Sequence, residues 1–183
     1  MKIQTRSLVI AAIMLAVTLI LGQLPVGGFI PIPGTPVRAT TLQIPTILAG
    51  ILGGPVAGLL TGLGFGISSM IRAAQLADPI FTNPVIAILP RLFIGVAAWY
   101  AYAAFRRINE TVGILGGAIV GSLTNTVLVV SMIILTGSLA PAVIVPIGIT
   151  YGAAEAVVSA IISLAVVGAV KGVEVGRRRG ASV

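Results

Sequence analysis

The sequence predicts an all-α integral membrane protein, a compact bundle of six transmembrane helices. Hydrophobic residues make up 57% of the 183 residues and charged residues only 8%, whereas a soluble domain has about 25% charged residues. Apolar runs close to the roughly 20 residues that a helix needs to cross a membrane recur along the chain. The predicted helices are 7–24, 40–53, 55–71, 83–105, 112–136 and 141–170, in one transmembrane domain (1–172) that is followed by a basic cytoplasmic tail (173–183).

The residue types exclude several classes of function. The chain has no cysteine, no histidine and four acidic residues, so disulfides, the usual zinc sites and histidine acid–base catalysis are absent. No phosphate-binding G-x-x-x-x-G-K-[ST] motif occurs. The cations form short clusters at segment ends, which argues against nucleic-acid binding. We expect a non-enzymatic protein without a cofactor or metal.

The first helix follows Lys2 and Arg6, an arrangement that a secretory signal peptide shares. The residues after this apolar run read "GQLPVGG", without the small-residue cleavage pattern of a signal peptide. A retained helix also gives an even helix count. We therefore predict a first transmembrane helix, and cleavage remains the alternative.

The segment 22–40, "GQLPVGGFIPIPGTPVRAT", is too apolar for a solvated linker and too rich in proline for a helix. We expect it to pack on the bundle, either as a permanent plug or as a lid over a cavity.

The second and third helices meet at Gly53, Gly54 and Pro55. Proline suits the first turn of a helix, where its missing N–H is not needed, so a tight helical hairpin is predicted. Glycines four residues apart continue along the third helix (Gly54, Gly58, Gly62, Gly66) and let helix backbones approach closely in lipid.

The distribution of lysine and arginine predicts the orientation. Cytoplasmic loops carry the excess of these residues. One side of the predicted bundle has eight of them (Lys2, Arg6, Arg106, Arg107, Lys171, Arg177, Arg178, Arg179), and the loops of the other side have two (Arg38, Arg72). Both termini are therefore expected in the cytoplasm.

Two charged residues lie deep within predicted helices. Arg91 follows Pro90 in "NPVIAILPRLF" (83–93), and Glu155 lies inside the sixth helix. Charges within the membrane are rare and face a partner or a cavity. Either the two residues form a structural salt bridge, or one or both line a polar pocket.

Neutral polar residues gather at the same depth, in the outer half of the bundle, whereas the inner halves are apolar. A pore would need polar residues along its full length, so an outward-facing pocket closed below is predicted. The candidate substrate-binding residues are Arg38, Gln43, Arg72, Asn83, Arg91, Asn125, Tyr151 and Glu155.

Three stretches carry a resemblance: "TTLQIPTILAGILGGPVAGLLTGLGFGISSM" (40–70), "FTNPVIAILPRLFIGVAAWYAYAAFRR" (81–107) and "GSLTNTVLVV" (121–130). The chain resembles the S components, the substrate-binding membrane subunits of energy-coupling factor (ECF) vitamin transporters. The resemblance implies high-affinity capture of a vitamin at the outer face of a bacterial or archaeal cell membrane. It also implies a membrane T component and two cytoplasmic ATPases as partners. Ala12 and Ala16 would face the T component, and residues 25–39 would be a lid.

The candidate pocket offers arginines, amides and hydroxyls but few aromatic rings, and flat aromatic vitamins usually need such rings for stacking. This favours a small, flexible, anionic ligand, because arginine can clamp a carboxylate. The sequence is most similar to the pantothenate-type S components, while folate, riboflavin and other micronutrients remain alternatives. Two other classes remain: a stand-alone proton-coupled transporter that uses Glu155, and a structural membrane protein without a ligand.

Overall fold

The computed structural model describes residues 4–24, 28–35 and 37–180, with side chains up to Lys171. Lys2 and the side chains of Arg177, Arg178 and Arg179, which entered the predicted orientation, lie outside this described part. So do residues 25–27 and 36 of the predicted lid.

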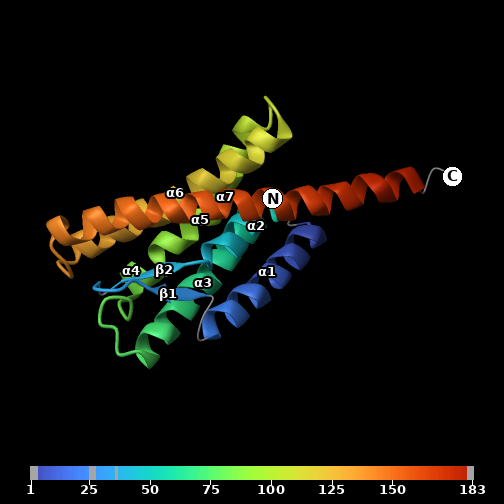
Figure 1. The fold of residues 1–183 in the computed structure, drawn as a ribbon. Helices are drawn as coiled ribbons and strands as arrows, with labels where there is room; N and C mark the ends of the chain where they lie inside the picture. The colour runs from blue at the N-terminus through green and yellow to red at the C-terminus, as the bar shows by residue number, and fades with distance from the viewer. Residues whose placement is uncertain (1–3, 25–27, 36, 181–183) are drawn as a thin grey trace.

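The described chain is mostly helical (Figure 1). Five stretches are long and apolar enough to cross a membrane: α1, α3, α4 with α5, α6, and α7 as far as Lys171; α2 is shorter, with 11 residues. This confirms the prediction of a helical membrane protein. The elements are α1 (Thr5–Gln23), β1 (Phe29–Pro31), β2 (Arg38–Thr40), α2 (Gln43–Gly53), α3 (Pro55–Gln75), α4 (Pro84–Ala87), α5 (Leu89–Phe105), α6 (Glu110–Leu135) and α7 (Pro141–Gly180).

The predicted hairpin between the second and third helices is present. Gly54 joins α2 to α3 with φ 88°, and Pro55 occupies the first turn of α3. A residue with a Cβ atom rarely adopts such a positive φ, whereas glycine does so readily. The turn therefore depends on glycine and proline together.

The short helix α2 lies at the centre of the bundle, and every residue from Leu42 to Ile51 is buried. It packs against α1, α3, α5, α6 and α7. Ile47, Phe65 and Ile94 are fully buried members of the apolar core around it. This placement gives the α2 N-terminus, with Gln43, access to α6 and α7.

Helices α3 and α5 cross with almost no side chain between them. A Cβ atom added at Gly95 would lie 2.4 Å from the Cα atom of Gly58, and one added at Gly62 would lie 2.1 Å from the carbonyl oxygen of Arg91. The glycine series predicted from the sequence thus lies at a helix crossing, as expected for small residues at four-residue spacing. The crossing places the backbone of Arg91 directly on α3.

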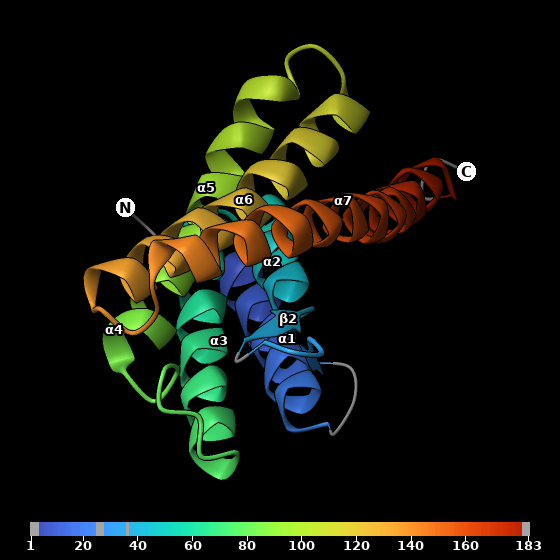
Figure 2. The same ribbon diagram turned by 60° about the vertical axis from the view of Figure 1, so that its left-hand side comes forward.

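Three elements differ from the sequence prediction. The fourth helix, expected at 83–105, is divided into α4 and α5 at Ile88, because Pro90 in the first turn of α5 cannot donate to the carbonyl four residues earlier. The segment 22–40 contains an antiparallel pair, β1 with β2, in which Phe29 lies opposite Thr40. The last helix does not end near 170 but continues to Gly180, through most of the segment predicted as the tail, and extends away from the bundle (Figures 1 and 2).

A polar cluster joins the last three helices at the opposite end of the bundle from the β1–β2 pair. The Tyr102 hydroxyl donates to Glu110 Oε1 at 2.8 Å, and Lys171 Nζ donates to the Tyr102 hydroxyl at 2.6 Å. Lys171 and Glu110 also form an ion pair. These contacts hold α7 against the connection between α5 and α6. Beyond them, the C-terminal part of α7 extends away from the bundle (Figure 1).

We expect Gly95→Ala to destabilise the protein, because its new methyl group would overlap the α3 backbone and overpacking costs about 1–3 kcal/mol. Gly168→Ala in α7 is the matched control, since no atom lies within 4 Å of its added Cβ. Thermal unfolding in detergent should show a lower midpoint for Gly95→Ala only. Equal midpoints for the two variants would contradict the close crossing.

Candidate functional site

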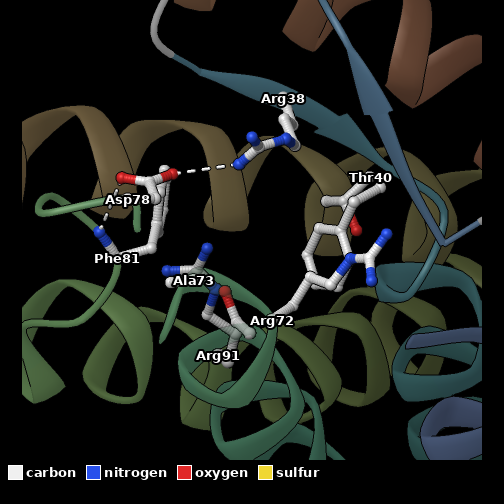
Figure 3. Close-up of a pocket in the computed structure, with 9 residues that line it drawn as sticks. Arg38, Thr40, Arg72, Ala73, Asp78, Phe81 and Arg91 are labelled. Carbon is white, nitrogen blue, oxygen red and sulfur yellow. Dashed lines mark hydrogen bonds and ion pairs between the residues drawn. The ribbon is translucent and has the colours of Figure 1, made fainter. Parts of the chain in front are cut away.

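Two adjoining cavities lie between the β1–β2 pair and the helices. The first, which we call the arginine chamber, has a volume of about 340 Å³, partly open to solvent (Figure 3). The second, which we call the amide chamber, has about 500 Å³, also partly open, and extends between α6 and α7. Their shared wall consists of Arg38, Thr40, Phe81 and Arg91. Both volumes include space that is open to solvent, so the closed part of each chamber is much smaller.

Arg91 is the central residue of the shared wall. It is 3% exposed, and its Nη1 donates a hydrogen bond to the carbonyl oxygen of Ile86. That carbonyl is the one that Pro90, four residues later, leaves without an N–H donor. The arginine thus stabilises the helix break that the proline causes. Its Nε atom is buried and has no hydrogen-bond partner, so a donor remains for a ligand.

The strand β2 closes one side of the arginine chamber. Arg38 Nη1 lies 3.1 Å from Asp78 Oδ2 in an ion pair, and Figure 3 shows this contact across the cavity. The other carboxylate oxygen of Asp78 accepts hydrogen bonds from the backbone N–H groups of Ile80 at 3.0 Å and Phe81 at 3.4 Å. One carboxylate therefore connects β2 to the loop before α4.

The end of the same strand is attached to α7. The backbone N–H of Thr40 donates to Glu155 Oε1 at 2.6 Å. Arg91 and Glu155 both line the amide chamber, but they do not form an ion pair within 4.0 Å. The structure thus favours the second interpretation of these two charges, in which both face a cavity.

Gln43 lies behind the wall of the amide chamber and contacts residues of α6 and α7. Its Nε2 donates to Ser122 Oγ at 2.9 Å and to Ser159 Oγ at 3.2 Å, and its Oε1 accepts from Asn125 Nδ2 at 2.9 Å. The Asn125 amide group is thereby oriented, because its nitrogen is engaged. Its Oδ1 is buried without a partner, and Asn125 lines the chamber. The site therefore has a free hydrogen-bond acceptor there.

The remaining predicted site residues differ in position. Arg72 lines the arginine chamber with its Nε buried and unpaired, and Tyr151 lines the amide chamber. Asn83 lines neither cavity; its Oδ1 accepts from the Val85 N–H at 3.0 Å and so caps α4. The structure thus brings together seven of the eight candidates, with Gln43 as a support behind the wall.

Sequence reasoning did not select Asp78, Thr40 or Phe65. Asp78 is one of only four acidic residues in the chain, and its scarcity was a usable signal. Thr40 acts through its backbone N–H, which no sequence pattern shows. Phe65 lies on the apolar face of α3, where a buried ring is expected for packing alone. Among the described residues, no group of three potential metal ligands occurs.

These features define a multi-pass membrane protein with a buried polar site at one end of its helices. The family described as "ECF transporter, substrate-specific component" matches residues 6–167. The chain belongs to this family, the substrate-specific (S) components of ECF transporters. The family and the five apolar spans identify a multi-pass protein of the bacterial cell membrane.

Two relatives are named for transport of one vitamin. The chain is 31% identical over 117 residues to the pantothenic acid transporter PanT of Lactococcus lactis subsp. cremoris. The alignment covers 55% of this chain and 58% of that protein. It is 28% identical over 141 residues to the pantothenate transporter PanT of Leuconostoc mesenteroides subsp. mesenteroides, covering 73% and 69%. The chain thus matches less than two thirds of the length of the Lactococcus protein.

We expect Glu155→Leu to speed amide exchange at Thr40 about tenfold or more in the ligand-free protein. Hydrogen bonds to charged groups contribute about 1.5–3 kcal/mol, and this variant removes the acceptor of the Thr40 N–H. Glu155→Gln is the matched control, because its amide oxygen can still accept. Hydrogen exchange of a peptide covering 37–42 measures both, and equal rates in all three proteins would refute the attachment.

Proposed function

We propose that this chain captures pantothenate at the outer face of the membrane for ATP-driven uptake by partner subunits of an ECF transporter. The observation that carries the proposal is the pair of chambers around Arg91, whose buried Nε has no protein partner. The two pantothenate transporters among its relatives support the choice of vitamin.

Pantothenate has a carboxylate at one end, an amide in the middle and two hydroxyls at the other end. The arginine chamber offers Arg91 and Arg72 for the carboxylate, because guanidinium groups bind carboxylates with charge-assisted hydrogen bonds. The amide chamber offers acceptors for hydroxyl or amide N–H groups at Asn125 and Glu155, beside apolar side chains of α6 and α7. Polarity along the site therefore matches polarity along the ligand.

The partner surface that we propose lies on α1. Ala12 and Ala16 are exposed and lie four residues apart on one face of the helix, among apolar side chains such as Ile13 and Ile20 that are also exposed. Ala12 borders an apolar groove between α1 and α3. Small residues allow a second helix to approach closely, so this face suits a helix of the T component. We propose that both termini lie on the cytoplasmic side, because the lysine and arginine residues are concentrated there in the sequence.

The proposed activity predicts that the purified chain binds pantothenate without ATP or other subunits. Isothermal titration in detergent should give a nanomolar Kd, and Arg91→Gln should weaken it at least about a hundredfold, because removing a charge-assisted contact in a buried site is costly. Thermal unfolding without ligand is the control for folding. Tight binding of another vitamin instead of pantothenate would overturn the assignment of the substrate. Binding of no vitamin at all would overturn the proposed function.

Substitution on α1 should separate binding from assembly. We expect Ala12→Trp or Ala16→Trp to leave the Kd for pantothenate unchanged while abolishing co-purification with a co-expressed T component and its ATPases. Ile161→Trp is the matched control, because Ile161 is 63% exposed on α7, away from this face. Loss of binding with assembly retained would reverse the assignment of the two surfaces.

A further inference from the structure

Two aromatic rings accompany the guanidinium of Arg91. Its Cζ atom lies over the ring of Phe65 at 5.3 Å from the centroid and over the ring of Phe81 at 5.2 Å. Phe65 comes from α3 and is fully buried, whereas Phe81 comes from the loop before α4 and is partly buried. Neither ring belongs to the proposed set of ligand-contacting groups.

The two rings stabilise the buried charge of Arg91 without occupying its hydrogen-bond donors. A buried arginine needs compensation for its lost hydration, yet a carboxylate in ion-pair contact would occupy the donors that a ligand carboxylate must reach. Arg91 has no such partner in the described part of the chain. Ring faces attract a cation through their quadrupole, most strongly where water is excluded. They stabilise the charge and leave the Nε–H donor unoccupied.

Of the two aromatic residues, Phe81 is the one whose backbone is bound by the Asp78 carboxylate. Its backbone N–H donates to Asp78 Oδ1 at 3.4 Å, and the same carboxylate pairs with Arg38 of β2 at 3.1 Å. Phe81 also lines both chambers. Figure 3 shows Arg38, Asp78, Phe81 and Arg91 around one cavity. The ring is thus placed by the strand that closes the site.

We propose that Phe81 is a positioning residue for carboxylate recognition: its ring holds the Arg91 guanidinium so that the free donors meet a ligand carboxylate. This inference rests on the proposed function, and it specifies how the site distinguishes a carboxylate from a neutral group. Phe81 acts through Arg91 and through the Asp78-anchored loop. Removal of the ring should therefore reduce selectivity for the charged ligand more than affinity for a neutral one.

The test compares pantothenate with pantothenol, in which an alcohol replaces the carboxylate. Phe81→Leu should weaken pantothenate binding about tenfold and pantothenol binding less than about threefold, as expected for the loss of one desolvated cation–π contact. Phe81→Tyr keeps an aromatic ring and should retain the selectivity of the original protein. Phe93→Leu on α5 is the matched control, because Phe93 is 49% exposed, lines a groove between α5 and α6, and lines neither chamber.

The ratio of the two dissociation constants is decisive. An equal loss for both ligands in Phe81→Leu would show a merely structural role and overturn the inference, as would an unchanged ratio with unchanged affinity. Both results leave pantothenate binding by the original protein intact, so they are distinct from failure of the proposed function. If Phe81→Leu does not fold, Phe81→Met supplies a flexible side chain of similar size without a ring, and the same ratio decides.

Discussion

The contact between the Arg91 guanidinium and the Ile86 carbonyl is the constraint on which the site depends. Pro90 deprives that carbonyl of its helical donor, and an unsatisfied carbonyl in hydrocarbon costs several kcal/mol. The neighbouring arginine supplies the donor from its side chain and turns back into the protein instead of facing lipid. The same contact fixes the side chain that separates the two chambers. A proline and a charged residue, each unfavourable alone in an apolar helix, are therefore compatible because each accommodates the other.

The glycine crossing makes this arrangement precise in space. Gly62 of α3 lies against the backbone of Arg91 in α5. About one helical turn away, Gly58 of α3 lies against Gly95 of α5. Because the two helices are in direct backbone contact, the ring of Phe65 on α3 lies against the guanidinium of Arg91 on α5. The same guanidinium donates to the Ile86 carbonyl of α4. A bulkier residue at the crossing would separate the ring from the cation. The small residues thus serve the site as well as the packing.

The helices, their hairpin at Gly54 and Pro55, and the burial of Arg91 were predictable from the sequence, because hydropathy, proline chemistry and the free energy of a buried charge act locally. The break at Ile88 was not part of the predicted helix 83–105, since its extent depends on the donor that Arg91 provides. Asn83 was predicted as a pocket residue because of its amide, but a position before Pro84 also suits a helix cap, which the structure shows. The β1–β2 pair was not predicted, because three-residue strands rich in proline carry no periodic pattern.

Gln43 was predicted as a site residue because it is polar. Its role as a support for Asn125 requires knowing which serines of α6 and α7 face it.

The distribution of charge around the site bears on which anions it can accept. Arg72 lines only the arginine chamber, where Asp78 is paired with Arg38. The amide chamber shares Arg38 and Arg91 but adds Glu155, whose carboxylate accepts from the Thr40 N–H. A ligand with one terminal carboxylate can place it beside Arg91 and direct hydroxyls towards Glu155 and the Asn125 oxygen. A ligand with carboxylates at both ends would bring like charges together in a poorly hydrated space, which is strongly unfavourable. Charge and the free acceptor therefore act on opposite ends of the ligand, and together they favour a monocarboxylate with a hydroxylated end over a dicarboxylate of the same length.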